Sequence, residues 1–186
     1  VSKICLAVQK LYRQKTNRVA SIYHCTASNG AGGGIFTKAD ASVLTMSGGV
    51  IRDCEAPNNE GGGLSVGATA QAHLHGVTVQ RCKAQFAGGG MYLGGNVSLV
   101  DVGIEDCCTT GASAAMYSGG SLRAERVRVA RASGYWGDGA VLDGTSTWID
   151  STFVDCPLGP GVSAGAHSFT RLSVRGATHY SRLESS

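Results

Sequence analysis

Residues 88–107, GGGMYLGGNVSLVDVGIEDC, contain two short motifs that recur along the chain. The first is a glycine triplet followed by an apolar residue, here residues 88–90 and Met91. In the second, apolar residues separated by two, one and two positions close on cysteine, here Leu99, Val102, Ile104 and Cys107. Together they predict a structural unit made of a glycine-rich turn followed by short strands.

Both motifs repeat with the same period. The apolar residue after the triplet, or after a degenerate copy of it, is Ile35, Leu64, Met91, Met116, Ala140 and Val162, at steps of 29, 27, 25, 24 and 22 residues. The closing position occurs at residues 25, 54, 82, 107, 132, 156 and 177. Seven copies with steps of 21–29 residues indicate a repeat solenoid, in which each unit packs on its neighbours.

Two kinds of solenoid have periods in this range, the leucine-rich repeat and the parallel β-helix, and the closing motif fits both. The return segment favours the β-helix, because each glycine of a triplet disfavours a helix by about 1 kcal/mol relative to alanine. Met91, Tyr92 and Leu93 also alternate as strand residues do. No six-residue beat of a left-handed helix is present. The prediction is an all-β, right-handed, single-stranded parallel β-helix of about seven coils over residues 19–178.

The glycine-triplet and apolar-x-x-Cys motifs resemble the repeats of polymorphic outer membrane proteins. The resemblance is one of pattern and covers roughly residues 20–180. It implies a right-handed β-helix with an adhesive or scaffolding use. It also implies an extracellular, cell-surface or organelle-lumen location.

The two ends of the chain fall outside the repeat. Residues 1–18 have apolar side chains at both helical and alternating spacings, so they predict a cap of the first coil, either an amphipathic helix or a partial coil. Such a cap would cover the open edge of a β-helix. Residues 179–186 are polar and are interpreted as a tail. No apolar run approaches the roughly 20 residues of a transmembrane helix.

Five of the seven cysteines occupy closing positions: Cys25, Cys54, Cys82, Cys107 and Cys156. Because these positions are one coil apart along a line, we expect a buried structural column and not a tetrahedral metal site. Disulfide bonds between stacked neighbours are the alternative. The preceding residues alternate in charge, which predicts a ladder of surface ion pairs or, alternatively, an ordinary solvated face: Asp53, Arg81, Asp106, Arg131 and Asp155.

Candidate catalytic residues are sparse. The outward positions after the triplets are Phe36, Ser65, Tyr92, Tyr117, Val141 and Ser163, whereas β-helical polysaccharide lyases and hydrolases need clustered carboxylates there. The best acidic pair, Asp138 and Asp143, is interpreted as turn chemistry. His73 and His75 lack a third metal ligand. The sequence therefore predicts no catalytic site, no metal site and no cofactor.

Two surfaces are candidates for binding. Phe36, Tyr92, Tyr117 and Val141 form an aromatic and apolar strip of a kind that marks partner contacts. Arg123, Arg126, Arg128 and Arg131 form a candidate basic patch for docking an acidic protein surface, whereas a net charge of +3 argues against nucleic-acid binding. The prediction is a non-catalytic scaffold or interaction subunit that docks onto a larger protein assembly, including one at a membrane surface. The alternative is a carbohydrate-binding or adhesive module that uses the same tyrosines, and a lyase- or hydrolase-like enzyme is less favoured.

Overall fold

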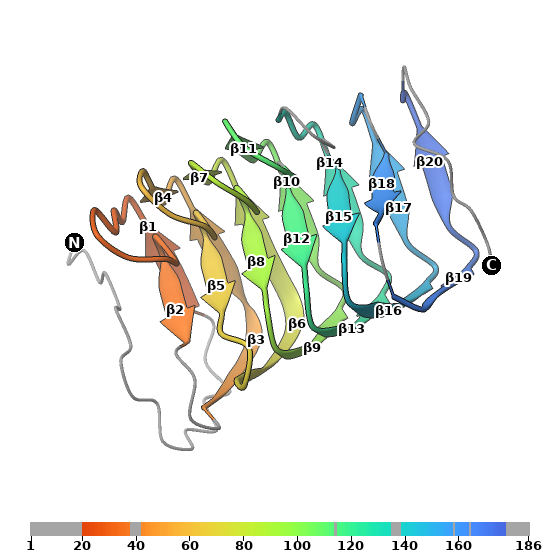
Figure 1. The fold of residues 1–186 in the computed structure, drawn as a ribbon, viewed down its shortest axis with the longest axis horizontal. Helices are drawn as coiled ribbons and strands as arrows, with labels where there is room; N and C mark the ends of the chain where they lie inside the picture. Colours follow the sequence, from red (N-terminus) through yellow and green to blue (C-terminus); the bar gives the residue numbers. More distant parts are fainter. Residues whose placement is uncertain are drawn as a thin grey trace.

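The computed structural model describes residues 20–37, 42–113, 115–134, 139–157, 159–163 and 165–177. Within these residues the chain forms strands and no helix. The strands form parallel sheets wound around one axis, so the predicted parallel β-solenoid is confirmed (Figure 1). The predicted cap over residues 1–18 and the tail over residues 179–186 lie outside the described residues.

The first sheet, sheet A, begins where the glycine triplets end. Its three-residue strands are β2 (Ile35–Thr37), β5 (Leu64–Val66), β8 (Met91–Leu93), β12 (Met116–Ser118), β15 (Ala140–Leu142) and β18 (Pro160–Val162). Each strand pairs in parallel with the strand one turn further along. Six such strands correspond to about six turns, against the seven coils expected. The difference arises because Cys25, the first closing position, is not preceded by a described strand of sheet A.

The 11-stranded sheet, sheet B, carries the closing motif. Its first strands are β1 (Ala20–Tyr23), β3 (Val43–Arg52) and β6 (Gln71–Gln80). In later turns the long strand is divided at a bend into β9 (Asn96–Val100) and β10 (Gly103–Glu105), β13 (Ser121–Glu125) and β14 (Arg128–Ala130), β16 (Thr145–Ile149) and β17 (Thr152–Val154), and β19 (His167–Thr170) and β20 (Ser173–Arg175). The small sheet C comprises β4 (Glu55–Ala56), β7 (Lys83–Ala84) and β11 (Cys108–Thr109).

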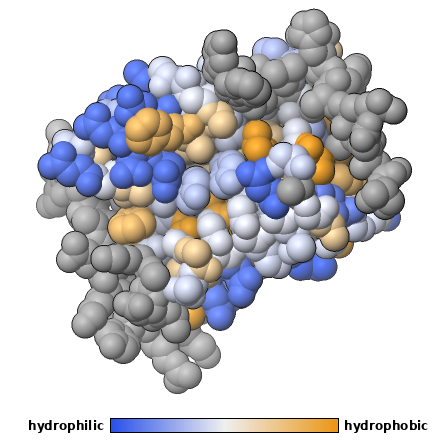
Figure 2. Space-filling view, viewed as in Figure 1, coloured by the Kyte–Doolittle hydropathy of each residue, from blue (hydrophilic) through white to orange (hydrophobic). Residues whose placement is uncertain are grey.

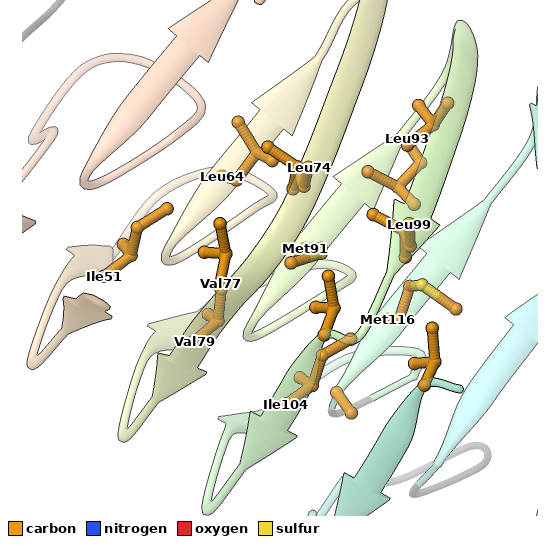
Figure 3. Close-up of a cluster of buried hydrophobic side chains, with 14 of the residues drawn as sticks. Ile51, Leu64, Leu74, Val77, Val79, Met91, Leu93, Leu99, Ile104 and Met116 are labelled. Atoms are coloured by element: carbon orange, nitrogen blue, oxygen red, sulfur yellow. The ribbon is translucent and has the colours of Figure 1, made fainter. Parts of the chain in front are cut away.

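The core is a narrow tube of aliphatic side chains enclosed by these sheets. Figure 3 shows Leu64, Met91 and Met116 of sheet A pointing into the same space as side chains of sheet B. Ile51, Val79 and Ile104 of the closing motif are fully buried there. Burial of each such side chain stabilises the fold by about 1.5–3 kcal/mol, so the stacked columns supply most of the stability.

The predicted position of Val162 is wrong. Strand β18 aligns Pro160 with Ala140 and aligns Val162 with Leu142, so Gly161 and not Ser163 is the outward residue. The cause is a shorter turn, because only residues 157 and 158 separate Cys156 from Gly159. A shorter turn starts the strand sooner, so the Gly-Pro-Gly sequence overlaps the strand and is not equivalent to the intact triplets.

Two buried serines in the tube differ in hydrogen bonding. The Ser118 hydroxyl has no hydrogen-bond partner and is aligned with Leu93 and Leu142. The Ser151 hydroxyl accepts a hydrogen bond from the Val127 N–H at 3.1 Å and donates one to the Ile149 carbonyl at 2.9 Å. The same substitution to alanine should therefore have opposite effects at the two positions.

We expect Ser118→Ala to raise the unfolding free energy by about 1 kcal/mol, because it removes an unsatisfied buried hydroxyl. Ser151→Ala should lower it by about 1–2 kcal/mol, because it leaves the Val127 N–H without its acceptor. Urea denaturation of the two variants and the parent protein measures both changes. Equal destabilisation by the two substitutions would contradict this account of the core.

Candidate functional site

Two columns of residues with left-handed backbone conformation line the bends of sheet B. One precedes the closing position and contains His24, Asp53, Arg81, Asp106, Arg131 and Asp155, with φ between 49° and 55°. The other precedes the middle apolar residue of the motif and contains Gly48, Gly76, Asp101, Arg126, Asp150 and Arg171. This conformation is unfavourable for residues with a Cβ atom, and arginine is not among the residues that are enriched in it.

Ion pairs between successive coils occupy these two columns. Arg81 donates to both carboxylate oxygens of Asp53, at 2.7 and 3.0 Å. Arg131 donates to both carboxylate oxygens of Asp106, at 2.7 and 2.8 Å. These contacts confirm two pairs of the predicted ladder at the closing positions, Asp53–Arg81 and Asp106–Arg131. In the second column Arg126 binds Asp101, and Arg171 binds Asp150. Hydrogen bonds from the arginines lower the pKa of all four aspartates.

The second ladder was missed by the sequence analysis. Its signal was present, because Asp101, Arg126, Asp150 and Arg171 alternate in sign with the same period. Each pair is exposed and contributes little to stability on its own. A shift by one coil would place like charges together, so the alternation favours the observed register.

The four arginines of the basic patch lie together on sheet B, and each has a carboxylate partner within the chain. Arg123 pairs with Glu125 at 3.2 Å, and Arg128 pairs with Glu105 at 3.4 Å. Arg126 and Arg131 also contact Glu125 and Glu105, in addition to the aspartates of the ladders. An acidic partner would therefore have to compete with four internal carboxylates.

The five cysteines of the closing positions are buried, with at most 1% of their surface exposed. The residues that follow the first four are aligned in parallel pairs, which places these cysteines one above another. No described cysteine forms a disulfide bond. The neighbouring Cys82 thiol and burial raise the pKa of Cys54, and the Cys107 thiol and burial do the same for Cys82. Such thiols stay protonated and act as packing groups.

The aromatic strip is a continuous outward column of sheet A. Phe36, Ser65, Tyr92, Tyr117 and Val141 are aligned in that order across five strands. Ser65 is buried and the other four are half-buried. The structure therefore brings together all four predicted strip residues. The rings of Tyr92 and Tyr117 are stacked, with centroids 5.0 Å apart and an angle of 9° between their planes.

Two carboxylates flank the tyrosine pair. The Tyr117 hydroxyl donates a hydrogen bond of 2.5 Å to Asp143, which directly follows β15. Burial, this hydrogen bond and the charge of Asp143 hold the pKa of Tyr117 well above its ordinary value. Burial and the charges of Glu60 and Asp143 raise the pKa of Tyr92. Both hydroxyls therefore remain protonated donors.

The sequence analysis treated Asp143 as a turn residue paired with Asp138, which lies outside the described residues. The missed signal is the position of Asp143, which directly follows β15, the strand paired with the strand of Tyr117. Glu60 was missed because it precedes a glycine triplet and occupies no strand.

A single exposed aromatic side chain adjoins this region. Phe86 is 54% exposed, and its N–H donates to the carbonyl of Asn59, the residue before Glu60. We use the term tyrosine face for seven residues of sheet A and its turns: Phe36, Glu60, Phe86, Tyr92, Tyr117, Val141 and Asp143. Figure 2, viewed from the side of sheet A, shows apolar patches interspersed with hydrophilic residues.

A shallow polar groove crosses the outer face of sheet B. It consists of two adjoining open depressions of about 260 and 250 Å³ that share Ser121, Leu122 and Thr147. Its lining mixes hydroxyl and amide side chains with apolar surface, and it includes His73, Asn96, Ser98 and Arg123. No carboxylate lines either depression.

Comparisons with known proteins found no matching family model, no matching curated protein and no matching solved structure. The resemblance to polymorphic outer membrane proteins therefore remains a prediction from the repeat pattern. Across the described ranges, no helix has the length and apolar character needed to cross a membrane. The same residues contain no group of three or more His, Cys, Asp or Glu side chains that could hold a metal ion.

Proposed function

We propose that this chain is a non-catalytic interaction module whose tyrosine face docks onto another protein. The observation that supports this function best is the stacked Tyr92–Tyr117 pair on an outward column of sheet A. Tyrosines are frequent energetic centres of protein interfaces, because they supply large contact areas with few rotatable bonds. Here both rings are held by strands that are hydrogen-bonded on either side, so docking requires little further ordering.

The geometry of the pair favours a protein partner over a sugar. A sugar packs against a free aromatic face, but each tyrosine already uses one face against the other ring. The residues aligned on the outer sides of the pair are Ser65 and Val141. The pair therefore offers edges and hydroxyl groups, which suit a mixed polar and apolar protein surface.

Carbohydrate binding is the second candidate, and the polar groove on sheet B favours it. Hydroxyl, amide and imidazole groups there could exchange hydrogen bonds with a polyhydroxylated ligand. The two candidate functions depend on different residues, on sheet A and on sheet B, so substitutions can distinguish them.

The test compares two double variants, Tyr92→Ser/Tyr117→Ser on sheet A and His73→Ala/Thr147→Ala in the groove. Proteins captured from the source organism are quantified by mass spectrometry, and the affinity of one purified candidate is then measured. We expect the tyrosine variant to weaken that affinity at least tenfold and the groove variant to leave it unchanged. Urea denaturation checks that both variants are folded.

A glycan array probed with the parent protein and the two double variants tests the second candidate. Glycan binding that is lost in the groove variant, together with protein capture that is unchanged in the tyrosine variant, would replace the proposed function by the second candidate.

A further inference from the structure

The two faces of the solenoid differ in charge. All described Lys and Arg residues belong to sheets B and C or to their bends: Arg52, Arg81, Lys83, Arg123, Arg126, Arg128, Arg131, Arg171 and Arg175. Among the described residues of sheet A and of the turns that lead into and out of its strands, two side chains are charged, Glu60 and Asp143. Both are negative although the net charge of the chain is +3, so the described residues around the tyrosine pair carry a net negative charge.

These two carboxylates also lack the ion pairs that most of the other described carboxylates form. On sheets B and C, seven described carboxylates form ion pairs: Asp53, Glu55, Asp101, Glu105, Asp106, Glu125 and Asp150. Neither Glu60 nor Asp143 forms an ion pair with any described residue. Asp143 instead accepts the Tyr117 hydroxyl. Three of the ten described carboxylates thus form no ion pair: Asp155, which follows β17, and the two that lie near the tyrosine pair, Glu60 and Asp143.

We propose that the tyrosine face binds an arginine-containing segment of the partner, with guanidinium groups paired to Glu60 and Asp143 beside the tyrosine rings. This inference rests on the proposed docking function and names the chemistry of the partner. Arginine suits the site better than lysine, because its planar guanidinium binds carboxylates with two hydrogen bonds. Phe86 supplies an exposed apolar contact for the remainder of the segment.

The state of Glu60 is consistent with a missing cation. Burial raises its pKa, and no cationic group among the described residues opposes that effect. A guanidinium group arriving at this carboxylate would restore the favourable interaction that burial removes. Burial and the charges of the same two carboxylates raise the pKa of Tyr92. A cation bound to these carboxylates would therefore also lie near Tyr92.

The test uses synthetic heptapeptides of alternating arginine and leucine, labelled with fluorescein, and fluorescence anisotropy. Matched peptides contain lysine or glutamate in place of arginine. We expect the arginine peptide to bind more tightly than the lysine peptide, and the glutamate peptide not to bind. The double variant Glu60→Gln/Asp143→Asn should weaken binding of the arginine peptide at least tenfold. The difference in affinity between the parent protein and the double variant should diminish as the salt concentration rises from 0.05 to 0.5 M, because the Debye length shortens.

Glu55→Gln serves as the control, because it removes a carboxylate that is paired with Lys83 on sheet C, outside the tyrosine face. It should retain the preference for arginine over glutamate. Equal affinity for the arginine and glutamate peptides, or an arginine affinity unchanged in the double variant, would overturn the inference.

Failure of the inference and failure of the proposed function are distinguishable. If partner affinity depends on Tyr92 and Tyr117 but not on Glu60 and Asp143, the docking function stands and the arginine segment is wrong. If the tyrosine double variant binds the partner as the parent does, the docking function is wrong whatever the peptides do.

Discussion

Gly62→Ala is expected to lower the unfolding free energy by about 3 kcal/mol or more, or to prevent folding. A Cβ atom at this position would lie 2.3 Å from the carbonyl oxygens of both Gly89 and Lys83 in the next coil. These are backbone atoms, so no side chain can rotate away to make room. The Gly62 N–H also donates to the Gly88 carbonyl at 3.2 Å, which holds the two turns together.

Gly103→Ala is the matched control. The nearest atom to a Cβ at Gly103 is the Thr78 methyl group at 3.8 Å, an ordinary contact distance. Because glycine is unfavourable within a strand by about 0.5–1 kcal/mol, this substitution should leave stability unchanged or raise it slightly. Thermal unfolding followed by circular dichroism, with urea denaturation, compares the variants. Similar losses at Gly62 and Gly103 would show that the triplet is not required by close approach of the coils.

Phe153→Ala is expected to cost about 3–5 kcal/mol, the second largest effect. The Phe153 ring is fully buried, 5.4 Å from the Trp148 ring, and it belongs to the same inward column as Ile104 and Val129. Removing it leaves a cavity between two coils whose spacing is fixed by strand pairing, so the structure cannot collapse to fill it.

The same substitution at Phe86 isolates the effect of burial. Phe86 is 54% exposed, so Phe86→Ala should change the unfolding free energy by no more than about 0.5 kcal/mol. Urea denaturation of both variants gives the comparison. A small effect at Phe153 would mean that the C-terminal coils contribute little to the cooperative unit.

Much of the candidate site could be predicted from the sequence, because strand alternation acts over neighbouring residues. Met91, Tyr92 and Leu93 alternate inward and outward, and the period then aligns Tyr92 with Tyr117. Glu60 and Asp143 could not be found in this way, because they occupy turns and no periodic position predicts where turn side chains point. Of the arginine partners, Asp106 was predicted from the alternation of charge at the closing positions, whereas Asp101 was missed although its column alternates with the same period.

The sequence by itself determined the period, the fold class and the main inward columns of this protein, because glycine turns and alternating apolar residues leave few other ways to bury the chain. Only the tertiary structure decided the register of the last strand of sheet A, where one short turn moves Val162 away from its predicted position. It also decided the charge of the two faces. Stacking pairs Asp53, Asp101, Asp106 and Asp150 with arginines of the next coil and leaves Glu60 and Asp143 near the tyrosines. These contacts join residues about one coil apart in the sequence.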